Sequence, residues 1–122
     1  MNTLPLEIKL RDSLKPGDIF VSSWGYGQTN IDFYMVVKVH NQQADFVHLE
    51  NKMVEDKHTQ TDLCVVPYMV VNKDQKTIRR KVKMWVNERT NEINLSAMMS
   101  YSQYASKWDG TPKYETHPHY GH

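Results

Sequence analysis

Residues 17–39, GDIFVSSWGYGQTNIDFYMVVKV, consist of two strand-like runs joined by a loop of aromatic and amide residues. Residues 18–24 are rich in the β-branched and aromatic side chains that favour strands. Residues 33–39 are apolar on both faces for most of their length, which is typical of a central strand. Pro16 and Gly17 precede the first run as a turn, because proline presets φ and glycine accepts a positive φ. We predict a pair of strands joined by a projecting loop over residues 25–32.

Further strand-like segments lie on both sides of this pair. Residues 4–10 alternate between apolar and polar side chains, and residues 46–51, 63–66 and 77–87 are apolar or alternating runs. Pro67 indicates an edge or a bulge where the third of these runs ends. Short strands separated by turn signals predict a mainly β (or α+β) single domain over residues 1–122. The expected architecture is a small antiparallel SH3-like barrel or a strongly bent sheet.

The last quarter of the chain has a different pattern. Leu95, Met98, Tyr101, Ala105 and Trp108 recur at spacings of three and four, which predicts either a short helix or an irregular segment. Residues 113–122 are rich in histidine and lie at the chain end, and we expect them to form a flexible tail.

Composition indicates a soluble protein of the cytoplasm, or of the host cytoplasm if it is phage-encoded. The chain has 122 residues, and its only cysteine is Cys64, so no internal disulfide is expected. The first residues carry charges and contain no apolar core of signal-peptide length. No apolar run approaches the length of a membrane span, so we expect no contact with a membrane.

Positive charge is concentrated in one short segment. The formal net charge is only +1, yet residues 73–89 hold seven Lys/Arg and two Asp/Glu. In an extended strand, Arg79, Lys81 and Lys83 would project from one face about 6.5–7 Å apart, close to the spacing of phosphates along a nucleic-acid strand. Trp85 continues that face, where it can stack on a base. The alternative is a solvated face on which the lysine stems cover apolar surface.

The loop after residue 23 has two interpretations. In the structural one, Trp24 and Tyr26 fold back onto the core. In the functional one, Trp24, Tyr26 and Gln28 form a second contact that stacks on a ligand and hydrogen-bonds to it. Asp32 and Asp109 are expected to tie loops to the barrel, together with Trp108, rather than to act as a carboxylate pair. Asp109 and Gly110 would close a turn against the Trp24 loop.

Catalysis and cofactors have little support in the sequence. No nucleophile elbow, phosphate-binding loop, paired-cysteine zinc motif or zinc-protease motif is present. We therefore assign no catalytic residue, no metal ligand and no cofactor. The histidines of the terminal tail are a poor frame for a metal site, because catalytic ligands need rigid support.

Two blocks of the sequence resemble a known group of proteins. Residues 23–34, SWGYGQTNIDFY, and residues 105–112, ASKWDGTP, are together similar to blocks in small, mostly uncharacterised proteins of phages, prophages and plasmids. The two blocks cover about a sixth of the chain. The resemblance implies a mobile-element origin and assigns no reaction. Gly27 stands where relatives often carry an acidic residue, so an ionic contact at that position is in doubt here.

These observations predict a small non-enzymatic binding module of a phage or other mobile element. Its expected partner is nucleic acid, bound through the basic strand. One alternative is a host-directed inhibitor that binds a bacterial defence or transcription protein. A second alternative, of a different class, is a small hydrolase.

Overall fold

The computed structural model describes residues 10–25, 29–54, 62–71, 74–100 and 103–116 of the chain. Within these residues, strands dominate and helix is almost absent, so the mainly β prediction is confirmed. The elements are α1 (Leu10–Ser13), β1 (Ile19–Trp24), β2 (Asn30–Val39), β3 (Gln43–Leu49), β4 (Asn51–Met53), β5 (Asp62–Pro67), β6 (Ile78–Val86), β7 (Ile93–Ser100), β8 (Gln103–Lys107) and β9 (Lys113–Thr116).

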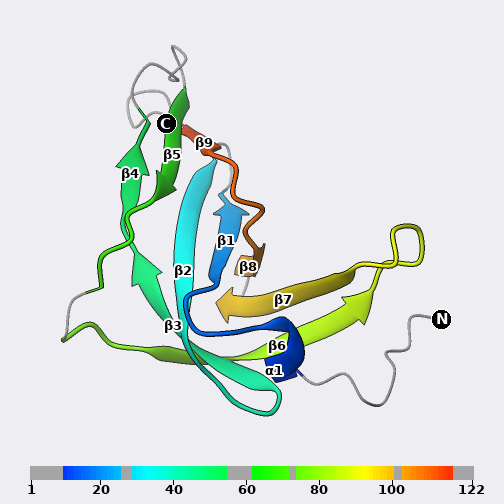
Figure 1. Cartoon of the computed structure of the whole chain (residues 1–122). Coiled ribbons are helices and arrows are strands. Elements are labelled where there is room, and N and C mark those ends of the chain that lie inside the picture. Colours follow the sequence, from blue (N-terminus) through cyan, green and yellow to red (C-terminus); the bar gives the residue numbers. More distant parts are fainter. Residues whose placement is uncertain (1–9, 26–28, 55–61, 72–73, 101–102, 117–122) are drawn as a thin grey trace.

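Six of the strands form a closed antiparallel barrel in the order β1-β2-β3-β6-β7-β8 (Figure 1). The pairing of β8 with β1, in which Phe20 lies opposite Lys107, closes it. Side chains that alternate along each strand fill the interior, with Phe20 and Phe46 in edge-to-face contact at its centre. Closure removes the free sheet edges that would otherwise expose unpaired backbone groups.

The remaining three strands form a small sheet in the order β4-β5-β9 beside the barrel (Figure 1). This sheet covers a second apolar cluster on the outer side of β1, β2 and β3, which includes Phe33, Leu49 and Val65. The strand β2 therefore lies between two cores. Its Tyr34 and Val36 face the barrel interior, while Ile31 and Phe33 face the second cluster. This double burial explains why β2 is apolar on both faces.

The turn before β1 has the expected chemistry. The Asp18 amide donates to the Lys15 carbonyl over 3.1 Å, and Gly17 has a φ of 97°. Proline at the second position and a positive φ at the third define a type II turn. Immediately before it, Leu10 and Leu14 are buried in the barrel-interior cluster. Leu10 belongs to α1 and not to the strand predicted over residues 4–10, of which the other residues lie outside the described part of the chain.

The prediction of a short helix in the segment that begins at Leu95 is wrong. This segment forms β7 and β8, in which Leu95, Ala97 and Met99 are buried and Met98 is exposed. Different apolar residues of this segment fit the two periods: Leu95 and Met98 fit a helical spacing, and Leu95, Ala97 and Met99 alternate. Tertiary pairing decides between them, because the barrel can close only if β8 pairs with both β7 and β1.

Two smaller expectations are also corrected. Residues 113–116, placed in a flexible tail by the sequence, form β9 and pair with β5, so that Tyr114 lies opposite Cys64. The rest of that tail lies outside the described residues. Pro67 ends β5, which is the middle strand of the small sheet, so the proline marks a strand end and not a sheet edge.

Candidate functional site

The outer face of β6 carries the basic residues that the sequence places there. Arg79, Lys81, Lys83 and Trp85 are all exposed, while Val82 between them is buried in the barrel. The strand continues with β7 as a long hairpin that extends away from the small sheet (Figure 1). The alternation therefore sets Lys81, Lys83 and Trp85 in a row on one side of this hairpin.

The two arginines of β6 are engaged with the protein itself. The Nε of Arg79 donates to Oδ1 of Asp45 over 2.8 Å, and this bond is the main reason that the pKa of Asp45 falls to about 2. Arg80, which interrupts the inward face of β6, donates from Nε to the Met99 carbonyl over 3.1 Å. Backbone acceptors thus accommodate a cation on an otherwise apolar face. Within the described part of the chain, Lys81 and Lys83 are exposed and form no ion pair.

The neighbouring strands extend this face without opposing its charge. β6, β7 and β8 contain no Asp or Glu, and they hold five Lys/Arg. On the outer face of β7 and β8, Met98 lies opposite Tyr104, and both side chains are about half exposed. On the same outer face, Lys83 lies opposite Ser96, and Ser96 lies opposite Ser106. We call the exposed side chains of Lys81, Lys83, Trp85, Met98 and Tyr104 the β6–β8 face.

A second polar region lies inside the barrel where β1 ends and β2 begins. Its centre is Asp32, a half-buried carboxylate that accepts hydrogen bonds from three other strands. Oδ2 of Asp32 accepts from the Trp24 indole over 2.5 Å and from Gln103 Nε2 over 2.8 Å. Oδ1 lies 3.1 Å from His48 Nε2. These contacts tie β1, β2, β3 and β8 together at one end of the barrel.

The hydrogen bonds also set the charge state of this cluster. The contact with His48 lowers the pKa of Asp32, against the opposing effect of burial. The same bond raises the pKa of His48, and the negative charges of Asp32 and Glu50 act in the same direction. The ring of His48 packs edge-to-face against Tyr34, with 5.3 Å between ring centroids. Asp32 and His48 therefore form a charge-assisted pair whose imidazole is held in a defined orientation.

The structure only partly describes the predicted aromatic loop. The Trp24 side chain is 44% exposed, and its N–H is committed to Asp32. Tyr26 and Gln28 lie outside the described residues, so a second contact through these three residues stays a prediction.

The second sequence block is held to the barrel by Trp108. The Trp108 amide donates to the Ile19 carbonyl over 2.8 Å, and its ring packs edge-to-face against Phe33. The bonds of Asp109 are local, to the backbone and hydroxyl of Thr111 and to Lys113, and they hold its pKa at about 2. Asp109 thus closes its own turn, and Trp108 connects that turn to β1 and β2.

Sequence reasoning missed four residues of these two regions. The sequence predicts a helix or an irregular segment around Met98 and Tyr104, and therefore not their position beside β6. It gives His48 a strand but no partner, and it indicates no role for Gln103. The alternation of residues 95–99, buried at odd positions, was the available signal for the first two. No local signal connects residues 32, 48 and 103.

No family model matches the chain, and no curated protein or solved structure is significantly similar to it. Over the described residues, no helix is both long and apolar enough to cross a membrane.

Proposed function

We propose that this protein is a small non-enzymatic module of a phage or other mobile element that binds single-stranded nucleic acid on the β6–β8 face. One observation carries the proposal: three adjacent strands contain no carboxylate, and their outer face bears two exposed lysines, Lys81 and Lys83, beside two exposed aromatic rings, Trp85 and Tyr104. Lysines beside aromatic side chains bind phosphates and stack on unpaired bases. The mobile-element origin rests on the two sequence blocks at residues 23–34 and 105–112.

The arrangement favours a single strand over a duplex. Trp85 and Tyr104 expose 38% and 55% of their surfaces on a strand face, and an aromatic ring there can stack only on a base that is not already paired and stacked. The lysines of β6, spaced about 6.5–7 Å apart, then follow the backbone of the same strand. The proposal does not depend on recognition of a particular sequence, because phosphate and stacking contacts are largely independent of base identity.

Fluorescence anisotropy of labelled single-stranded and double-stranded oligonucleotides, measured over a series of salt concentrations, tests this function. We expect tighter binding of the single strand, with an affinity that falls linearly with salt on logarithmic axes. The variant Lys81→Gln/Lys83→Gln removes two phosphate contacts, so the slope decreases by about 1.4 for a single strand. The control Lys15→Gln/Lys52→Gln makes the same charge change on exposed lysines outside the β6–β8 face.

Two outcomes would contradict the proposal. One is the absence of binding at low salt. The other is equal weakening by the test and control variants, which would indicate a non-specific effect of net charge. If nucleic acid does not bind, the same exposed lysines and rings suit an acidic partner protein. A host-directed inhibitor then becomes the favoured function, and capture of a host protein by wild type but not by Lys81→Gln/Lys83→Gln tests it.

A further inference from the structure

Lys83, Ser96 and Ser106 form a row across the middle of the β6–β8 face, with one residue from each strand. Lys83 of β6 pairs with Ser96 of β7, and Ser96 pairs with Ser106 of β8. Their chain neighbours Ala97 and Ala105 are buried inside the barrel, so the row lies on its outer side. Paired residues lie about 4.5–5.5 Å apart, which brings one ammonium group and two hydroxyls together. We call these three residues the central row.

The fold does not use the hydroxyls of the central row. Ser106 is exposed and Ser96 is half-buried, and neither side chain forms a hydrogen bond within the described part of the chain. Among the described residues that are not exposed, the fully buried side-chain oxygen or nitrogen without a partner is that of Ser22, so the Ser96 hydroxyl reaches the surface. A free hydroxyl is both a donor and an acceptor. These two serines therefore offer hydrogen bonds that the folded chain itself leaves unused.

Large side chains stand on both sides of the central row. Trp85 follows Lys83 by two residues toward the tip of the hairpin, and Tyr104, opposite Met98, lies two residues from Ser106 in the other direction. The spacing of strands and of residues along them separates the two aromatic positions by about 16 Å, diagonally across the sheet. A strand whose bases stack on both rings must therefore cross the central row. Its backbone can approach the sheet closely there, because serine is small.

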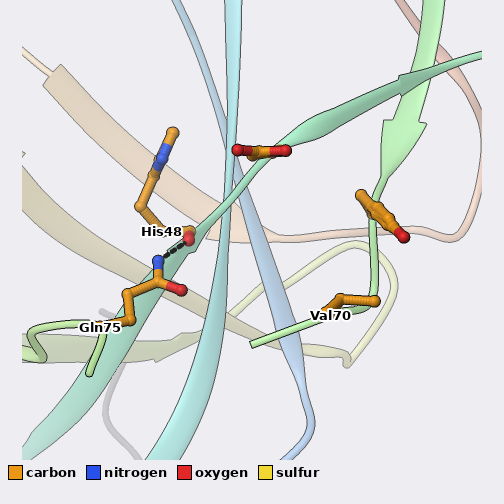
Figure 2. Close-up of a pocket in the computed structure, with 5 residues that line it drawn as sticks. His48, Val70 and Gln75 are labelled. Carbon is orange, nitrogen blue, oxygen red and sulfur yellow. Dashed lines mark hydrogen bonds between the residues drawn. The ribbon is translucent and has the colours of Figure 1, made fainter. Parts of the chain in front are cut away.

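A pocket of about 310 Å³ beside the end of β3 is not part of this surface. Figure 2 shows His48 and Gln75 on one side of the pocket and Val70 on the other. His48 faces the barrel interior, where its ring packs against Tyr34, whereas the central row is on the outer side. A nucleic-acid strand on the β6–β8 face thus lies on an open sheet, and its selectivity comes from the side chains of the sheet itself.

We propose that the β6–β8 face binds RNA in preference to DNA, because the serines of the central row recognise the ribose 2′ hydroxyl. This inference rests on the proposed function, in which a single strand occupies the face. The 2′ hydroxyl is the group by which a protein distinguishes RNA from DNA, and it both donates and accepts hydrogen bonds. Serine hydroxyls do the same, so either partner can act as the donor.

The order of residues in the central row matches the order of groups along the RNA backbone. In RNA the carbon that carries the 2′ hydroxyl is bonded to the carbon that carries the 3′ phosphate. A phosphate held by Lys83 therefore brings the neighbouring 2′ hydroxyl to Ser96, the residue paired with Lys83. Ser106 extends the hydroxyl side of the row across the next strand.

DNA lacks the matching group at this position. Its deoxyribose presents only carbon and hydrogen where RNA has the hydroxyl. A bound DNA strand would displace water from the half-buried Ser96 without replacing the hydrogen bond, and a polar group covered in this way is costly. The phosphate and stacking contacts are the same for both nucleic acids, so the central row decides between them.

Oligonucleotides that differ only at the 2′ position test this inference on the intact protein. Fluorescence anisotropy compares oligouridine with oligodeoxyuridine of the same length and label, so that bases and charges are identical. A third probe, 2′-fluoro-oligouridine, keeps an RNA-like sugar conformation without the hydroxyl. We expect oligouridine to bind about fivefold more tightly than either of the other two, as for the loss of one ordinary hydrogen bond.

A double serine variant assigns the preference to the central row. Ser96→Ala/Ser106→Ala should make the three affinities equal and leave the salt slope unchanged, because no charge is removed. The control Ser13→Ala/Ser23→Ala changes one half-buried and one exposed serine outside the β6–β8 face, and it should retain the preference for oligouridine.

The outcomes separate this inference from the proposed function. Salt-dependent binding with equal affinity for all three probes overturns the inference and leaves the proposed function standing. The same holds if the preference for oligouridine persists in Ser96→Ala/Ser106→Ala, or if 2′-fluoro-oligouridine binds as tightly as oligouridine, which would indicate recognition of sugar conformation. Absence of binding to every probe at low salt overturns the proposed function, and the inference with it.

Discussion

The Asp32 cluster and the β6–β8 face use polar residues in opposite ways. Around Asp32, an indole, an amide and an imidazole all bind one carboxylate, so most of their hydrogen-bonding capacity is consumed within the fold. On the β6–β8 face, Lys81 and Lys83 are exposed at the surface of a hairpin whose strands contain no acidic residue. Both regions are conspicuous in the sequence for similar reasons, namely aromatic side chains beside polar ones. Only the second has charged groups that are exposed to solvent and form no ion pair within the described part of the chain.

The comparison shows that residue type is a weak guide to availability. Trp24 and Trp85 have similar exposure, yet the N–H of Trp24 is bound to a carboxylate, whereas Trp85 lies on a strand face with cationic neighbours. A polar group that stabilises the fold is expected to affect stability when removed. A group that faces solvent should affect binding instead. The following three predictions test this division, in order of decreasing effect.

Removal of the central carboxylate should have the largest effect on stability. Asp32→Ala leaves the half-buried donors of Gln103 and His48 without their acceptor and removes the charge-assisted bonds. We expect the free energy of unfolding to fall by about 2–3 kcal/mol. Urea denaturation followed by tryptophan fluorescence or circular dichroism measures it. Asp109→Ala, whose bonds are confined to an exposed turn, is the control and should cost clearly less.

The division would be disproved if Asp32→Ala and Asp109→Ala lowered the free energy of unfolding by the same amount. A smaller loss at Asp32 than at Asp109 would show that the connections between four strands contribute little to stability.

The pH dependence of stability should reveal the Asp32–His48 pair. The lowered pKa of Asp32 stabilises the fold above the ordinary value of 3.8, and this contribution is lost as pH falls further. The raised pKa of His48 stabilises the fold below the ordinary value of 6.5, and this contribution is lost as pH rises through the folded-state pKa. The contribution of this pair to the melting temperature should therefore be highest between about pH 4 and 6.5.

The variant His48→Gln should remove the decrease in melting temperature above pH 6.5. Melting curves of wild type and variant over pH 4–9, at constant ionic strength, measure the difference. His40→Gln is the control, because His40 pairs with Asp45 outside the cluster. An unchanged profile in His48→Gln would show that the imidazole does not contribute to stability through its charge.

Removal of the exposed lysines should have the smallest effect on stability. Lys81→Gln/Lys83→Gln should change the free energy of unfolding by no more than about 0.5 kcal/mol, as is usual for exposed side chains without structural partners. Measured in the same denaturation experiment as Asp32→Ala, this pair provides the contrast between the two regions. A large loss would mean that the lysine stems stabilise the barrel, and the β6–β8 face would then have a structural role.

Much of the fold could be predicted from local pattern. The alternation of residues 78–86 and the apolar run on both faces of β2 predicted these two strands, and Pro16 and Gly17 predicted the turn before β1. These predictions succeeded because each depends on the side chains of a few consecutive residues. The helix prediction for the segment after Leu95 failed because one subset of its apolar residues has a helical spacing while another alternates. β9 was missed because its pairing partner lies some fifty residues earlier in the chain.

The candidate site divides in the same way. The sequence by itself determined that Arg79, Lys81, Lys83 and Trp85 share one face, since side chains two apart on a strand point to the same side. Only the tertiary structure decided that Asp45 engages Arg79, that Met98 and Tyr104 lie beside β6, and that His48 and Gln103 meet Asp32. Barrel closure brings these distant residues together. Such contacts depend on strand order and register, which no local periodicity encodes.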